Sequence, residues 1–137
     1  MSFNLYDLND SLDNDDPIGF NSKAILYDEP DINKLAYHHK EKLNHFSAKA
    51  IMFMILMEMK HNIVSEVEIF KVGVCDLFDI TTNVLYEFET TGYKSVQQRV
   101  NDIYKQTGVE VIVIDVKELP DDIYQRYLKL KEYVIID

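Results

Sequence analysis

Two strand-like runs joined by a polar turn occupy residues 73–90, and this stretch constrains the fold more than any other. It reads GVCDLFDITTNVLYEFET, with Thr81-Thr82-Asn83 as the turn between the runs 72–80 and 84–90. Apolar, β-branched and aromatic residues bounded by a short polar turn are typical of a β-hairpin. The sequence therefore predicts two neighbouring antiparallel strands, which the fold must place in a sheet.

Acidic residues follow both arms of this hairpin. In the second arm Glu87 and Glu89 share a face, and Asp76 lies in the first arm. A short hairpin would bring the arms side by side, about 5 Å apart, which is metal-binding distance. A hard cation such as Mg²⁺ or Mn²⁺ stabilises clustered carboxylates through oxygen ligands. The hairpin by itself leaves two interpretations open, a metal site and an ordinary solvated face, and favours the solvated face.

Length and charge divide the chain into two parts. Its 137 residues fit one domain, and 47% hydrophobic residues suffice for a core. The net charge of −10 argues against a basic nucleic-acid binder, but residues 1–32 carry eight acids and only one lysine. We predict an acidic N-terminal arm over 1–32 and one α/β domain over 33–137. The arm is either disordered or lies across the domain through Phe20, Ile25, Leu26 and Tyr27.

The only cysteine, Cys75, cannot form an internal disulfide, which favours a reducing, intracellular setting and a cytoplasmic location. We expect it to be a buried thiol. The N-terminus lacks the basic and apolar regions of a signal peptide, and the most apolar run, Ala50 to Met57, is too short to span a bilayer. No membrane association is expected.

A long helix is predicted from Asn33 to Lys60. Its second half, AIMFMILMEM, is apolar nearly all round, which indicates either the domain centre, our preference, or a dimer seam. Its first half is polar. We favour a solvated helix start there, with the alternative that Glu41, His45 or Lys49 reaches the site.

The remaining chain completes an alternating pattern. HNIVSEVEIF is expected to be a strand with alternating faces. One face carries Ile63, Ser65, Val67 and Ile69, and the other carries Val64, Glu66 and Glu68. A helix over 96–106, a strand over 109–116 covered on both faces, and a last helix follow. This last helix is expected to pack through Ile123, Tyr127, Leu130 and Val134, with Asp115 before it as a cap or turn partner. The order α-β-β-β-α-β-α predicts a sandwich with a mixed central sheet.

This order, with an Asp in the second strand and an acidic Glu87-x-Glu89 pair in the third, resembles the PD-(D/E)XK nuclease superfamily. The stretch GVCD…YEFET is especially similar to small archaeal and archaeal-virus members. The resemblance covers about residues 34–134 and implies a restriction-endonuclease-like sandwich. It also implies that Asp76 and Glu87 are metal ligands. Glu89 stands where the family usually has Lys, and either Glu66 or Glu68 would match an additional acidic ligand.

The resemblance implies a Mg²⁺- or Mn²⁺-dependent nuclease that hydrolyses phosphodiester bonds in DNA as an endonuclease or exonuclease. Glu89 would act as general base, and Lys94 from the loop after the strand is a possible cation. Lys94, Gln98 and Arg99 are the candidate substrate contacts. The alternative is a catalytically inactive protein of the same fold with an interaction or assembly role, dimerising through the first helix. A third hypothesis is an acidic mimic of nucleic acid, for which the arm is the evidence.

Overall fold

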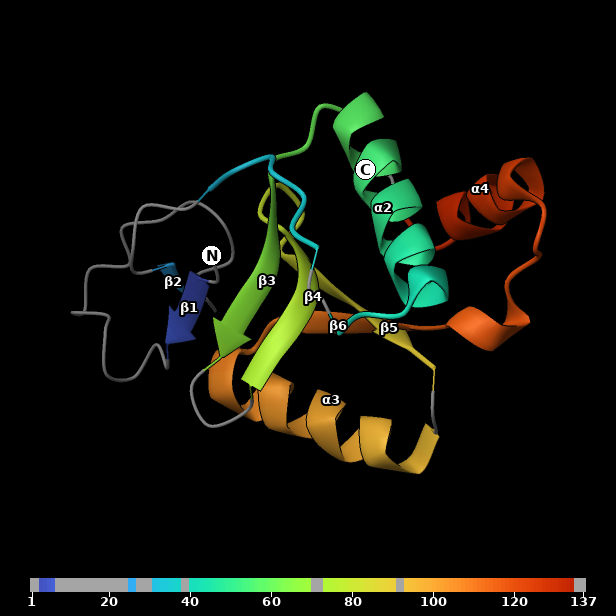
Figure 1. Cartoon of the computed structure of the whole chain (residues 1–137). Helices are drawn as coiled ribbons and strands as arrows, with labels where there is room; N and C mark the ends of the chain where they lie inside the picture. The colour runs from blue at the N-terminus through green and yellow to red at the C-terminus, as the bar shows by residue number, and fades with distance from the viewer. Residues whose placement is uncertain are drawn as a thin grey trace.

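The computed structural model describes residues 3–6, 25–26, 31–37, 40–69, 73–90 and 93–134. In these ranges the chain builds a six-stranded mixed sheet in the order β2-β1-β3-β4-β5-β6. Helices α2 and α4 cover one face of the sheet and helix α3 covers the other (Figure 1). The expected α/β class is therefore confirmed. The elements are β1 (Phe3–Tyr6), β2 (Ile25–Leu26), α2 (Leu43–Glu58), β3 (Ile63–Ile69), β4 (Gly73–Asp79), β5 (Val84–Glu89), α3 (Tyr93–Thr107), β6 (Glu110–Asp115), the 3-10 helix η1 (Val116–Glu118) and α4 (Ile123–Lys131).

The predicted hairpin is confirmed as strands β4 and β5, which pair antiparallel. Its turn uses Asn83 with a φ of 60°, a left-handed conformation that asparagine tolerates better than most residues. The buried carboxylate of Asp79 supports the turn by accepting a hydrogen bond from Thr81 N at 3.0 Å. As the alternation predicts, the apolar face of β5 packs under α2 and α4 through Val84, Tyr86 and Phe88.

Helix α3 carries the chain from β5 to β6, which lies parallel to β5. Ile112 of β6 packs against the core on the α2 face, and Val111 packs against the core on the α3 face. The prediction of a strand covered on both faces is thus confirmed. Asp115 ends this strand and accepts a hydrogen bond from Lys117 N at 3.0 Å, the capping role expected from the sequence.

Two short strands from the predicted acidic arm extend the sheet beyond β3. Strand β1 runs parallel to β3, with Leu5 opposite Ile69, and β2 pairs antiparallel with β1. The arm thus joins the edge of the domain's sheet through β1, whereas Ile25 and Leu26, expected to contact the domain, pair with β1. Phe20 and Tyr27, expected to help hold it there, lie outside the described residues.

The helix predicted from Asn33 is wrong over its first part, because α2 begins only at Leu43. Asn33 has a φ of 63° and clamps the start of β3: its N donates to Ile63 O at 2.7 Å, and Ile63 N donates to Asn33 Oδ1 at 2.9 Å. Ser65 Oγ likewise accepts from Ala36 N and donates to Lys34 O, both at 2.9 Å. Hydrogen bonds to a strand 30 residues away outweigh the local helix propensity.

The second half of α2 is core, the interpretation that the sequence favours. Its buried side chains face the sheet and α4, and they include Ile51, Met52, Ile55 and Leu56. Met54 and Met57 are 51% and 39% exposed, so part of the apolar surface of the helix faces outward.

The last two helices differ from the prediction in detail. Helix α3 begins at Tyr93, three residues earlier than expected. In α4, Tyr127, Leu130 and Val134 pack against the core as predicted, but Ile123 is 71% exposed. Buried Arg126 lies in the helix interface instead and donates to Pro120 O at 2.9 Å and to Asn44 O at 3.3 Å, which ties α4 to the start of α2.

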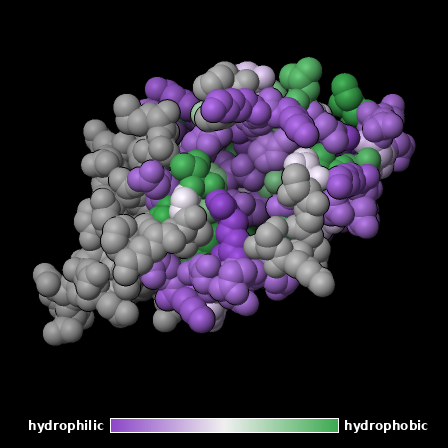
Figure 2. Space-filling model, turned by 60° about the horizontal axis from the view of Figure 1, so that its bottom comes forward, coloured by the Kyte–Doolittle hydropathy of each residue, from purple (hydrophilic) through white to green (hydrophobic). Residues whose placement is uncertain are grey.

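No helix among the described residues is long and apolar enough to cross a membrane. On the face shown in Figure 2, hydrophilic residues predominate and hydrophobic residues form small separate patches.

Candidate functional site

Strands β4 and β5 separate at Asp76 and Glu87. Their backbone register runs from Asp79 opposite Val84 to Leu77 opposite Tyr86. One step further, side chains replace the backbone ladder: Asp76 N donates to Glu87 Oε1 at 3.0 Å, and Phe88 N donates to Asp76 Oδ2 at 2.8 Å. The two predicted carboxylates therefore meet at a fork between the strands, where they satisfy backbone donors that the ladder leaves open.

Glu66 lies opposite Asp76, on strand β3, which pairs with the edge of β4 that faces away from β5. Ser65 pairs with Leu77 and Val67 with Cys75, which places Glu66 opposite Asp76. Glu66 has a φ of 57°, uncommon for a residue within a strand. At this point β3 reverses its faces: Ile63 packs on the α2 side, but Val67 and Ile69 pack with Val64 on the α3 side. The regular alternation predicted for this strand is therefore wrong.

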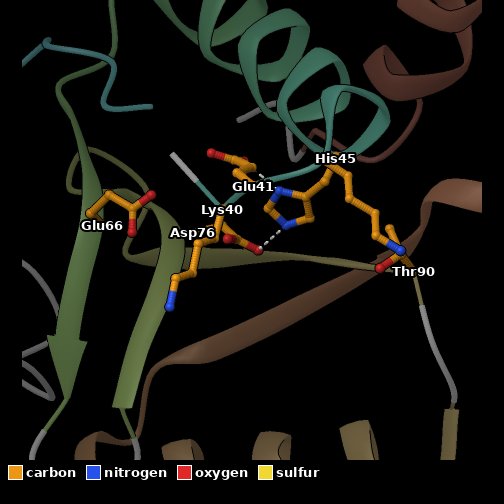
Figure 3. Close-up of a pocket in the computed structure, with 7 residues that line it drawn as sticks. Lys40, Glu41, His45, Glu66, Asp76 and Thr90 are labelled. Carbon is orange, nitrogen blue, oxygen red and sulfur yellow. Dashed lines mark hydrogen bonds and ion pairs between the residues drawn. The ribbon is translucent and has the colours of Figure 1, made fainter. Parts of the chain in front are cut away.

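An open cavity of about 350 Å³ lies above the fork. Figure 3 shows its polar side chains converging from β3, from β4 and from the start of α2. The lining comprises Lys40, Glu41, Lys42, His45, Glu66, Asp76 and Thr90. Three carboxylates and three other ionisable side chains therefore share one recess, with the exposed Lys40 and Lys42 among them.

His45 lies between two of the cavity carboxylates (Figure 3). Its Nδ1 is hydrogen-bonded to Glu41 Oε2, and its Nε2 is 3.3 Å from Asp76 Oδ2. Burial lowers the pKa of this imidazole, but Asp76 and Glu41 together outweigh burial and raise the pKa to about 9. His45 is therefore a cation at neutral pH, held between two anions.

Lys49 binds two of the cavity carboxylates, Glu41 and Glu66, from the buried face of α2. Its side chain is fully buried, and its Nζ donates to Glu41 Oε1 at 2.9 Å, to Glu66 Oε1 at 3.0 Å and to Ala36 O at 2.9 Å. A buried lysine is rare unless it is paired, and here two anions and a carbonyl surround it. Glu41 thus joins Lys49 to His45, and His45 joins Glu41 to Asp76.

Glu87 continues the network on the α3 side of the sheet. Its Oε2 lies 3.2 Å from Arg99 Nε, and its Oε1 accepts from Asp76 N. Burial, followed by the negative charge of Asp76, raises the pKa of Glu87 to about 7. Arg99 also donates to Val74 O and contacts Cys75 Sγ at 3.5 Å. The buried Cys75 has its thiol pKa raised by burial, which fits the expected inert thiol.

The other predicted site residues lie apart from the cavity lining. Glu68 is exposed on β3, and Glu89 is half-buried beyond Glu87 on β5. Gln98 is exposed on α3 and donates to Asp102 Oδ1 at 2.9 Å. Arg99, expected to contact substrate, pairs with Glu87. The side chain of Lys94 lies outside the described part of the chain.

Glu41, His45 and Lys49 are the site residues to which the sequence interpretation gave too little weight. The favoured solvated helix start is wrong for these three, which are only 5%, 18% and 0% exposed. A signal was present, because residues 41, 45 and 49 recur at four-residue steps and form one stripe that runs into the buried face of α2. Charged residues at that spacing are usually solvated. These three are buried because they form ion pairs with one another and with the carboxylates of β3 and β4.

In donor chemistry the cavity fits Mg²⁺ or Mn²⁺, since Glu41, Glu66 and Asp76 offer carboxylate oxygens from three segments. The side chains of the cavity are, however, not placed for metal binding in this structure. Across the described ranges, no group of three or more His, Cys, Asp or Glu side chains is placed to hold a metal ion. The carboxylates are instead bound to His45 and Lys49.

Comparisons with protein-family models, curated proteins and solved structures find no match to this chain.

Proposed function

We propose that the protein is a divalent-metal-dependent nuclease that hydrolyses phosphodiester bonds in DNA. The observation that carries this proposal is the cavity above the strand fork, where Glu41, Glu66 and Asp76 lie together with Lys40 and Lys42. Carboxylates suited to a hard cation, next to lysines suited to phosphate, form the combination that metal-assisted phosphodiester hydrolysis requires.

The succession of elements supports a restriction-endonuclease-like assignment within the α/β class. Helix α2, the meander β3-β4-β5, the crossover helix α3 and the parallel strand β6 follow the order α-β-β-β-α-β. In this order Asp76 lies in the second strand of the meander and Glu87 in the third, at the point where the two strands part. The resemblance to PD-(D/E)XK nucleases thus rests on the order of the elements and on the two acids.

Glu41, Glu66 and Asp76 would hold Mg²⁺ or Mn²⁺. When bound, such an ion lowers the pKa of a coordinated water and polarises the phosphoryl oxygen. Glu87, predicted as a ligand, has a different role in this proposal, because it does not line the cavity and instead accepts from Asp76 N and pairs with Arg99. It orients Asp76. Glu89, expected to act as a base, receives no role because it does not line the cavity.

Lys40 and Lys42 would bind the phosphates of the substrate at the cavity. Both side chains are exposed and lie on the segment before α2. A chain with a net charge of −10 repels a long duplex, so the proposal favours single-stranded or structured DNA.

The test compares Glu66→Gln with its matched control Glu68→Gln. The two glutamates are two residues apart on β3, but only Glu66 lines the cavity. Calorimetry measures Mn²⁺ binding, and labelled single-stranded, branched and duplex DNA report cleavage with Mg²⁺ or Mn²⁺. We expect Asp76→Asn and Glu66→Gln to lose metal binding and cleavage while Glu68→Gln keeps both. A wild-type protein that neither binds Mn²⁺ nor cleaves any of these substrates would refute the proposal.

A second candidate is an inactive protein of this fold with an assembly role. Its support is that His45 and Lys49 already neutralise the cavity carboxylates and that Met54 and Met57 leave apolar surface on α2. Light scattering of the wild type and of a Met54→Lys, Met57→Lys variant tests it. A dimer that the double variant disrupts, together with absent metal binding, would favour this candidate over the nuclease.

A further inference from the structure

Lys49 is the most deeply buried charged group of the network. None of its surface is exposed, and it lies on the face of α2 that meets the sheet. The aromatic ring of Phe46 lies 5.5 Å from its Nζ, which adds a favourable contact for a cation. The energetic penalty of burying an ammonium group is large, so this position requires strong internal partners.

The partners of Lys49 come from three separate segments. Ala36 belongs to the strap (residues 31–37) that precedes the helix, Glu41 lies just before α2, and Glu66 lies at the point where β3 reverses its faces. An ammonium group has three N–H donors, and these three acceptors at 2.9–3.0 Å use all of them. Lys49 consequently has no donor left for a phosphate or a water in the cavity.

Glu41 connects Lys49 to the rest of the site through hydrogen bonds. One of its oxygens binds Lys49, and the other binds Nδ1 of His45. The opposite nitrogen of His45 faces Asp76. Lys49 thereby fixes Glu66 directly, and it fixes His45 and Asp76 through Glu41.

We propose that Lys49 is a positioning residue that holds the cavity carboxylates Glu41 and Glu66 in place for the reaction without touching the substrate. This inference rests on the proposed function for the reaction itself. Lys49 acts on the carboxylates rather than on the phosphate, because Glu41, Glu66 and Ala36 take all three of its donors.

The experiment replaces Lys49 by Met, which keeps an unbranched side chain one atom shorter and removes its charge. Lys129→Met is the matched control, because Lys129 loses the same charge on α4 and is 46% exposed in a surface pair with Glu132. The first measurement is the ¹⁵N spectrum of the histidine rings in metal-free protein at one pH. The second is Mn²⁺ affinity by calorimetry, and the third is kcat and KM for DNA cleavage.

We expect Lys49→Met to shift the His45 ring signals and to weaken Mn²⁺ binding by about 10- to 100-fold, the usual effect of removing a group that orients metal ligands. The value of kcat should fall while KM for DNA stays unchanged, because Lys49 makes no contact with the substrate. Lys129→Met should behave as wild type in all three measurements. A purely structural role would change thermal stability without this split between kcat and KM.

Removing one partner of a buried ion pair is strongly destabilising, so the single variant can fail to fold. The double variant Lys49→Met, Glu66→Gln then removes opposite charges together, and the His45 signals are its readout. Unshifted His45 signals in the folded variant would overturn the inference. A wild type that neither binds Mn²⁺ nor cleaves DNA would refute the proposed function instead, and the His45 signals would still decide whether Lys49 positions the cavity.

Discussion

Glu66 has the least favourable backbone conformation for its residue type among the cavity residues. A φ of 57° inside a strand is disfavoured for a side chain with a Cβ, by roughly 1–3 kcal/mol. Two features accompany this strain: Glu66 forms an ion pair with Lys49, and strand β3 reverses its faces at Glu66. The strand is thereby able to bury Ile63 on the α2 side and Val67 on the α3 side, with a carboxylate at the point of reversal. Local strain at this residue is what presents an acid to the cavity.

The pKa of His45 predicts a specific dependence of stability on pH. Its pKa in the fold, about 9, lies above the ordinary value of 6.5, so the folded protein binds this proton more tightly than the unfolded chain does. The stabilisation is complete below about pH 6.5 and is lost as the pH rises through about 9. We therefore expect the thermal midpoint to fall across this interval, as measured by circular dichroism.

His45→Gln is the control for that measurement, since it removes the titrating group and should flatten the profile between pH 7 and 9. Glu87 acts in a lower window. Burial raises the pKa of Glu87 from 4.5 to about 7. Ionisation of Glu87 therefore lowers the stability of the fold as the pH rises from 4.5 to about 7, and it has no further effect above that pH. The same downward slope above pH 7 in His45→Gln and wild type would contradict the assignment to His45.

At the scale of elements, the strap of residues 31–37 decides where helix α2 starts. Asn33 holds it to β3 with a pair of hydrogen bonds to Ile63 and has a left-handed φ. Asn33→Ala removes the side-chain acceptor from Ile63 N and puts a residue without a local hydrogen bond into this conformation. We expect a loss of about 2 kcal/mol in the free energy of unfolding, measured by urea denaturation.

The neighbouring substitution Lys34→Ala serves as the control. Lys34 is 74% exposed and lies 3.7 Å from Asp31, and a surface pair of this kind contributes about 0–1 kcal/mol. Asn33→Gly separates the two effects, because glycine accepts the left-handed φ but still lacks the acceptor. Equal stability of Asn33→Ala and Lys34→Ala would show that the strap does not hold β3.

At the scale of the whole molecule, the charge distribution limits how DNA could bind. The net charge is −10, and two exposed lysines, Lys40 and Lys42, line the cavity. Each phosphate contact with single-stranded DNA contributes about −0.7 to the slope of log K against log salt, so we predict a slope of about −1.4 from two contacts. Fluorescence anisotropy with the Asp76→Asn variant measures this slope, because cleavage is not expected there.

Lys42→Met should reduce the magnitude of that slope by about 0.7, and Lys129→Met should leave it unchanged. A slope as steep as about −5 would indicate a broader basic surface than these two lysines provide, and binding that does not depend on salt would exclude phosphate contacts at the cavity.

The hairpin shows which structural features the pattern of neighbouring residues predicts. The alternation of Val84, Tyr86 and Phe88 and the turn at Asn83 are properties of a few consecutive residues, and the strands follow from them. The fork follows in part, since Asp76 and Glu87 were expected side by side. Their actual contacts, each carboxylate binding a backbone N–H of the opposite strand, depend on where the ladder ends.

The sequence by itself therefore determined the α/β class, the hairpin, the apolar half of α2 and two of the acids at the fork, because each of these depends on neighbours along the chain. Tertiary structure alone decided the rest of the site. Glu41, His45 and Lys49 look solvated in a helical pattern, and they become a buried network only because the fork lies beneath them. The strap and the reversal at Glu66 likewise depend on hydrogen bonds and ion pairs between distant segments, whose energies no local propensity contains.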